Sequence, residues 1–595
     1  MPTNMKTLQL ENIITPDELA TAISRMWVKW HTMRQPTITA WDEIRRYIFA
    51  TDTTSTSNNS LPWKNKTTVP KITQIRDNLH ANYMAALFPK RKWLHWFGED
   101  RESATVEKRV AVEDYMSWAT DHPEFKKEAS KLVYDYIDYG NCFAMPTWVD
   151  GTIETESGKT THNYEGPAII RISPLDIVFN PISSNFTSSP KIIRSVIQRG
   201  DLFGMLEEDS DMDQESKEEL MKYFQTLSAN ASELSSDLSE KDSYLRVDGF
   251  DSFRGYLESD YCELLTFYGD IYDPDTGTYK RNHKIIVADR HKIISDKENP
   301  SFFLYPPIFH AGWRVRQDNL WAMGPLENLV GMQYRIDHIE NLKADVFDLN
   351  AFPPLKVKGW VEDFKWGPME RINVGDEGDV IPLPPDASIL QANMEIANLQ
   401  AQMEEMAGAP KEAAGFRSPG EKTAYEVQRI ENAYNRIFSA KIRQYESFME
   451  DILNAMLELG RRKFTDKTIA LWNDELKIQV FKDLTIENIT GVGRLRPLAA
   501  QHHAEKAEKI QNITQLFQTL GADPNIRMHF SSEKIARLVE ELLDLEKDEI
   551  VQPYIQISEN MQAQRLQMSA QENLMMESQT PSGLTPEDYD EETPI

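Results

Sequence analysis

The sequence predicts a mainly α-helical fold with smaller β modules (α+β), and three observations lead to this prediction. Apolar residues recur at helical spacing over long stretches, and the longest of these, 423–462, spans roughly ten helical turns. Shorter regions at 142–172, 261–312 and 468–496 alternate or run apolar as β-strands do. The 595 residues are enough for several domains or for one elongated subunit of several segments.

The N-terminal part, 16–205, follows residues 1–15, which we expect to be mobile. Thr15-Pro16-Asp17-Glu18 begins a helix, because proline is favoured in a first helical turn. We expect this helix to end near Met33, and a second one to cover 41–48 before a polar loop. Further helices are predicted at 72–87, 105–121 and 123–139, and strands at 142–148 and 166–172, with Asp150-Gly151 as the hairpin turn.

The middle of the chain changes composition and period twice. Residues 206–260 are rich in Asp, Glu and Ser, which predicts an exposed acidic insertion leading towards a long helix. Residues 261–312 predict a separate β module built around a turn at 273–277. Within the segment 313–350, Gly324-Pro325 then opens a helix that reaches about Asn350 and is ~35–40 Å long at 1.5 Å per residue.

The C-terminal half, from 351 onwards, contains two helices joined by a hinge. Asp386 is placed to cap a helix over 386–406, glycine and proline interrupt it at 407–424, and the long apolar stripe follows. We group residues 351–497, which contain both helices and the hinge, as one region of the chain. The pattern of 498–548 predicts further helices. The tail, 549–595, is rich in Gln, Met and Ser, and we expect it to be partly disordered.

The hinge at 407–424 is positively charged in a chain that is acidic overall. Lys411, Arg417 and Lys422 lie within a dozen residues of one another, against only Glu412 and Glu421. Such a segment can contact a polyanion. The alternative is an ordinary surface loop between two antiparallel helices.

The net charge of −29 argues against a protein that wraps nucleic acid, because such binders are normally basic. It is compatible with a channel, in which an acidic wall with a few basic positions lets DNA slide. The two cysteines are too few for a disulfide framework, which favours a reducing compartment. We expect no membrane span and no secretory signal, and therefore a protein made in a cytoplasm.

Motifs of known enzyme classes are not found in the sequence. There is no phosphate-binding Walker loop, no nucleophile elbow and no HExxH helix, and Gly491-Val492-Gly493 is too short for a dinucleotide fingerprint. Adjacent histidines on a helix point in different directions, so His502-His503 makes a poor metal site. We expect no catalytic residue, no metal and no cofactor.

Several motifs, taken in chain order, resemble tailed-bacteriophage portal proteins, also called head-to-tail connectors. Gly415 and the run Ser418-Pro419-Gly420-Glu421-Lys422-Thr423-Ala424 resemble the helix restart after the tunnel loop of that family. The order of helix, Gly140-Asn141 and strand, followed by Pro174-Leu175-Asp176, resembles its wing domain. The resemblance covers roughly residues 15–545 and is of the podovirus type.

The resemblance implies an elongated subunit of a ring at one capsid vertex. Its parts would be a wing at 16–205 and 351–497, a clip at 261–312, a stem at 313–350 and a crown at 498–548. A ring of roughly twelve subunits would package and eject double-stranded DNA and bind the terminase, the capsid or scaffolding protein and tail adaptors. The residues that face DNA would be Lys411, Arg417 and Lys422, with Phe416 at the loop tip.

Two other classes of protein stay open. One is a different ring-forming virion or tail protein, which would share the long helices without needing a basic hinge. The other is a nuclease, which would gather carboxylates around a divalent ion.

Overall fold

A computed structural model describes residues 19–498, with gaps at 50–64, 89–92, 155–159, 199, 205–216, 219–221, 223–260, 274–277, 291, 300–304, 365–371, 384–388, 390, 409–423, 464–466 and 474–477. The chain divides into two units, Met1–Ala500 and Gln501–Ile595, and everything described below belongs to the first. The predicted crown at 498–548 and tail at 549–595 therefore lie almost entirely outside the described residues. No helix among the described residues is long and apolar enough to cross a bilayer.

The first helix, α2 (Leu19–Phe49), is continuous over 31 residues, whereas the sequence predicts two helices. Pro36 lies inside it, although a proline within a helix removes one hydrogen bond and costs about 3 kcal/mol. Tertiary contacts on both sides of Pro36 offset this cost. Arg34 is buried and donates to the carbonyls of Pro174, Leu175 and Ile177 at 2.6–2.7 Å, and Trp41 is buried one turn beyond the proline.

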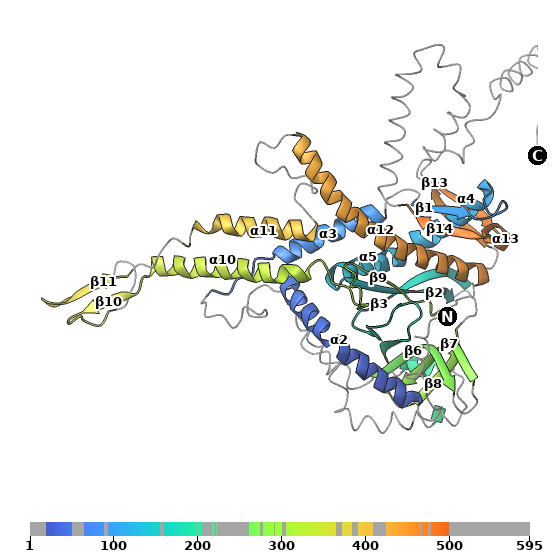
Figure 1. Cartoon of the computed structure of the whole chain (residues 1–595), viewed down its shortest axis with the longest axis horizontal. Helices are drawn as coiled ribbons and strands as arrows, with labels where there is room; N and C mark the ends of the chain where they lie inside the picture. The colour runs from blue at the N-terminus through green and yellow to red at the C-terminus, as the bar shows by residue number, and fades with distance from the viewer. Residues whose placement is uncertain are drawn as a thin grey trace, which may run out of the picture. The chain divides into compact units, whose positions relative to one another are not determined.

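Four further helices surround the main hydrophobic core, and Figure 1 shows α12 crossing over α3, α5 and the neighbouring strands. They are α3 (Lys71–Leu87), α4 (Val106–Asp121), α5 (Pro123–Asp138) and α12 (Ala424–Lys463). The predicted helix pair 105–121 and 123–139 and the restart at 423 agree with these bounds. Gly140 follows α5 with φ +66°, and a side chain there would clash with the backbone of Met323, so only glycine fits.

A three-stranded antiparallel sheet lies against this core, in the order β3-β2-β9. Its strands are β2 (Asn141–Glu154), β3 (Thr160–Ile172) and β9 (Phe309–Gly312). The predicted turn at Asp150-Gly151 is wrong, because Asp150 pairs with Glu165 and the strands continue past it. The Gly-containing dipeptide coincides instead with a register shift between Gly151 and Thr152, which glycine tolerates inside a strand.

The strands of 261–298 do not form a module of their own. A five-stranded antiparallel sheet runs in the order β4-β5-β6-β7-β8, so that strands from before and after the acidic insertion share it. Its strands are β4 (Ile177–Phe179), β5 (Lys191–Gln198), β6 (Tyr261–Asp273), β7 (Thr278–Ala288) and β8 (Lys292–Glu298). One face packs on the first half of α2, where Trp27 and Ile23 meet Phe267 and Leu265. Burying this second core requires all five strands, which explains the difference from the predicted module at 261–312.

Two small two-stranded sheets complete the body. β1 (Leu94–Gly98) pairs with β14 (Gly493–Pro497), and β12 (Lys467–Asn473) pairs with β13 (Ile478–Leu484), followed by the short α13 (Ile486–Ile489). The first pairing joins segments about four hundred residues apart in the chain. Asn454 of α12 fixes β14, because its side chain accepts from the Leu495 amide and donates to the Leu495 carbonyl.

Residues 330–407 form a continuous segment that extends away from the body and returns to it. α10 (Val330–Ala351), preceded by the 3-10 turn η6 (Glu327–Leu329), runs outward, and α11 (Asn393–Ala407) returns beside it (Figure 1). At their far end β10 (Leu355–Lys358) pairs with β11 (Asp379–Pro382). The helix predicted from Asp386 begins seven residues later, at Asn393, and ends at Gly408, whose φ is +72°.

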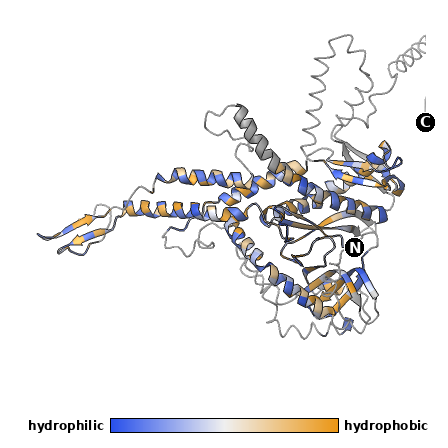
Figure 2. Ribbon diagram, in the orientation of Figure 1, coloured by the Kyte–Doolittle hydropathy of each residue, from blue (hydrophilic) through white to orange (hydrophobic). Residues whose placement is uncertain are grey.

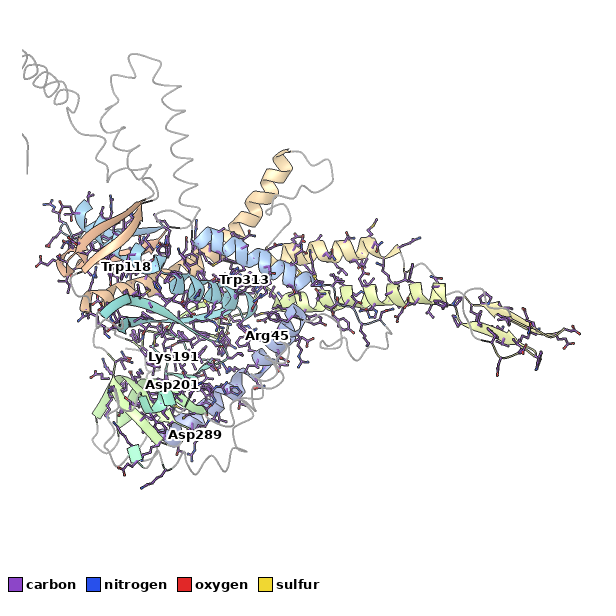
Figure 3. The ribbon with its side chains drawn as sticks, turned by 180° about the vertical axis from the view of Figure 1, so that it is seen from behind. Arg45, Trp118, Lys191, Asp201, Asp289 and Trp313 are labelled. Atoms are coloured by element: carbon purple, nitrogen blue, oxygen red, sulfur yellow. The ribbon has the colours of Figure 1, made fainter. Side chains whose placement is uncertain are left out.

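Lys191 is an internal lysine at the start of β5 and is labelled in Figure 3. Its ammonium donates to the carbonyls of Thr187 and Ser189 at 3.1 and 2.9 Å and lies 4.6 Å from the centre of the Phe186 ring. Burial lowers the pKa of Lys191 to about 7, because desolvation disfavours the charged form.

This pKa predicts a pH dependence of stability that replacing Lys191 removes. The unfolded chain holds the Lys191 proton up to pH ~10, whereas the folded chain releases it near 7, so between these values the free energy of unfolding rises with pH. We expect a slope of roughly 1 kcal/mol per pH unit between pH 7 and 9, absent in Lys191→Met. Urea unfolding at each pH measures it, with the exposed Lys127→Met as control. Equal slopes in wild type and Lys191→Met would contradict the prediction.

Candidate functional site

The sequence-predicted site lies outside the described residues. Lys411, Phe416, Arg417 and Lys422 all fall in 409–423, between the end of α11 at Ala407 and the start of α12 at Ala424. The structure therefore describes only the two helices that join this segment. Within the described ranges, no group of three or more His, Cys, Asp or Glu side chains is arranged to hold a metal ion.

The excursion 330–407, here called the stalk, has a surface that sequence analysis did not identify. Side-chain burial falls along α10, from Ile336 and Ile339, which belong to the main core, to Phe347, which is 67% exposed. The returning helix behaves in the same way, since Met403 and Ile396 are buried while Met394, at its outer end, is 77% exposed. The outer half of the stalk thus presents large apolar side chains that no segment described by the structure covers.

The strand pair at the far end of the stalk has one apolar and one polar face. Directly paired residues share a face, so Leu355, Val357, Val380 and Pro382 lie on one side of β10–β11. Lys356, Lys358 and Asp379 lie on the other side, with Ile381. Figure 2 shows both hydrophobic (orange) and hydrophilic (blue) residues along these two strands. A two-stranded hairpin is at best marginally stable by itself, so this apolar face calls for a further packing partner.

The exposed apolar side chains of the stalk form a set large enough to define an interface. They are Phe347, Leu349, Phe352, Val357, Trp360, Val374, Ile381, Leu383, Met394 and Met406. Full burial of one such side chain stabilises an assembly by about 1.5–3 kcal/mol. Concentration of this many on one excursion is typical of a surface that binds another protein. Periodicity predicts that α10 is amphipathic, but it does not reveal that the outer half of the apolar stripe remains exposed among the described residues.

The segment of α10 from Gln333 to Asp345 is fixed to the body by four polar side chains spaced four residues apart. They are Gln333, Asp337, Asn341 and Asp345, here called the polar ladder. The first three are fully buried, which polar side chains rarely are unless they form hydrogen bonds. Together they bind the backbone of residues 65–72, which runs along α10.

Hydrogen bonds of the polar ladder recur at every second residue of the bound segment. The amides of Asn65, Thr67 and Val69 donate to Asp345, Asn341 and Asp337 respectively, at 2.9, 2.8 and 2.9 Å. In the other direction, Asn341 and Gln333 donate to the carbonyls of Thr67 and Val69 at 2.8 and 2.5 Å. Four helical residues rise about 6.0 Å and two extended residues about 6.6 Å, so the two repeats stay in step over three contacts.

A buried ion pair fixes the returning helix at the same level. Lys71, in the first turn of α3, donates to Glu404 of α11 at 2.5 Å, and the two side chains are 4% and 9% exposed. Gln74 accepts a second bond from the Lys71 ammonium at 3.0 Å. The base of the stalk is thus joined to the body through both of its helices.

Removing one member of this pair should destabilise the protein more than removing both. We expect Glu404→Gln to lower the free energy of unfolding by about 3 kcal/mol, because it leaves the Lys71 charge buried and uncompensated. Lys71→Met combined with Glu404→Met should recover most of that loss. Urea unfolding measures both, with the exposed Glu405→Gln as control. A double variant that is less stable than Glu404→Gln would contradict this account.

Comparison with known families gives one match. Residues 466–579 match a family described as FPL: uncharacterised conserved protein, and the match covers about a fifth of the chain. Within it the structure describes β12, β13, α13 and β14. The search of curated proteins finds no match.

This match corrects the family assignment expected from the motifs. FPL is not a phage portal family, so the assignment of the chain to the portal proteins is contradicted. The short runs that carried the resemblance, such as 418–427, consist of common turn and helix-start residues. Residues of these types commonly begin a helix after a loop, and many unrelated proteins contain such runs.

Proposed function

We propose that the chain is a structural subunit of a closed homo-oligomeric ring whose channel carries double-stranded DNA. The observation that carries this proposal is the exposed apolar surface of the stalk. It is too extensive to remain in water without a partner, and each copy of the chain brings the same surface. Contacts of one patch with a different patch on the next copy close into a ring when the rotation allows it.

Two features support a second copy as the partner. Apolar side chains are exposed on α10, α11 and the β10–β11 pair, so that both helices and the hairpin offer contact area. The polar ladder and the Lys71–Glu404 pair hold the base of the stalk in place, which limits the entropy lost when stalks pack together. A stable interface requires roughly 800 Å² from each partner, within reach of an excursion of this length.

The charge of the stalk suits a channel for DNA. Among its described residues, 12 Asp and Glu stand against 4 Lys and Arg, so the wall would repel phosphates and let a duplex slide. The basic run Lys411, Arg417 and Lys422 follows the inner end of α11 and would supply the few attractive contacts. The terminase, capsid and tail partners expected from the sequence depended on the family resemblance alone and form no part of this proposal.

Charged residues in the apolar stalk should prevent assembly without unfolding the subunit. In Phe347→Glu/Met394→Glu we expect the self-association constant to fall at least roughly 100-fold, because two apolar contacts per subunit are lost. The thermal midpoint of the subunit should stay unchanged, since both side chains are exposed in it. Sedimentation and negative-stain imaging measure the assembly.

A matched control for this variant is Ile182→Glu/Val492→Glu, which changes two exposed apolar residues outside the stalk. The control should assemble like the wild type. A wild-type protein that stays monomeric at every salt and protein concentration, or a control that loses assembly equally, would overturn the proposal.

The basic run should contact DNA in the assembled ring. In Lys411→Ala/Arg417→Ala/Lys422→Ala the ring should form normally, because no apolar stalk residue is changed. Its affinity for duplex DNA should fall, and the slope of log affinity against log salt should decrease by about three if all three cations contact phosphates. Unchanged affinity and slope in an assembled variant would remove these residues from the proposed site.

A further inference from the structure

A second group of cations, outside the stalk and the 409–423 segment, lies around Trp313. Arg314 and Arg316 follow Trp313 in the chain directly after β9, and Lys441 comes from α12. None of the three makes an ion pair with a residue that the structure describes. Both arginines are exposed, in a chain with a net charge of −29.

Trp313 holds two of these cations close together. The Lys441 ammonium donates to the Trp313 carbonyl and lies 4.7 Å from the centre of its ring, and the Arg314 guanidinium lies 5.2 Å from the same ring. The ring itself is buried, and its Nε1 donates to the Tyr83 hydroxyl at 3.0 Å (Figure 3 labels Trp313). Burial, and then the charge of Arg314, lower the pKa of Lys441.

The loop that carries the arginines is held in shape by the backbone. Arg314 and Met323 exchange two backbone hydrogen bonds at 3.1 and 3.0 Å and close the loop 314–323. Glu327 is the nearby carboxyl that both guanidiniums affect, but it is largely buried and accepts from the Gly324 amide at 3.0 Å. Glu327 thus interacts with both guanidiniums, and an external anion would relieve the repulsion between the cations.

We propose that Arg314 and Arg316, with Lys441 behind them, contact the phosphate backbone of double-stranded DNA. This inference rests on the proposed function, since a DNA conduit is what brings a polyanion to the surface. Two exposed guanidiniums two residues apart suit a repeating row of phosphates, and guanidinium forks bind phosphate oxygens directly. The contact would add to the one expected from the basic run after α11.

The experiment measures binding of a fluorescent duplex DNA to the full-length protein by anisotropy over a range of KCl concentrations. In Arg314→Gln/Arg316→Gln we expect the slope of log affinity against log salt to decrease by about two, as counterion release at two phosphates is lost. Arg314→Lys/Arg316→Lys keeps the charge and should retain the slope. Lys126→Gln/Lys127→Gln removes two exposed lysines that are paired with Asp121 and Glu124, and should also retain it.

Two results would overturn the inference. One is a slope that is unchanged in Arg314→Gln/Arg316→Gln or falls equally in the Lys126 and Lys127 control. The other is displacement of DNA by inorganic phosphate beyond the effect of KCl at equal ionic strength, because it would identify a site for free phosphate. Sedimentation of the same samples separates the two proposals. A monomer with the expected loss of slope contradicts the ring alone, whereas an assembled ring with an unchanged slope contradicts this contact alone.

Discussion

The base of the stalk is fixed to the body because four residues of an α-helix and two residues of an extended chain span nearly the same distance. Side chains every fourth residue along α10 meet backbone groups every second residue along 65–72, and both repeats advance by nearly the same distance. The side-chain amide of Asn341 makes two of these contacts, since it accepts from the backbone amide of Thr67 and donates to the Thr67 carbonyl. Backbone groups of this segment thereby find hydrogen-bond partners on the side chains of a helix.

The stalk therefore has two halves with different physical roles. Its inner half is held to the body by hydrogen bonds and an ion pair, through the polar ladder and the Lys71–Glu404 pair. Its outer half exposes large apolar side chains that no described segment covers, and Phe347, Trp360 and Met394 are among the most exposed. A rigid base and an uncovered end together favour association of stalks, because little freedom remains to be lost when the ends pack against each other.

The cationic side chains of the body fall into two groups, those paired with carboxylates and those without such a partner among the described residues. Most described cations near the core are neutralised, as in the bidentate pairs of Arg76 with Asp138 and Arg171 with Asp135. Arg314 and Arg316 differ because they are exposed and have no such partner among the described residues. This contrast separates charges that maintain the fold from charges that remain available to a ligand.

The sequence by itself determined the positions of α5 and α12 and the end of α11, because apolar periodicity and the punctuation by Gly140 and Gly408 are local properties. Only tertiary structure decided the rest. Pro36 stays inside a helix because Arg34 and Trp41 are anchored on either side, and strands 261–298 join β4 and β5 because the second core needs them. Asp337 is buried because its partner lies 268 residues away in the chain, at Val69. The exposed end of the stalk could not be predicted from the sequence for the same reason. A helical stripe shows which residues are apolar, whereas their burial depends on whether another segment packs against them.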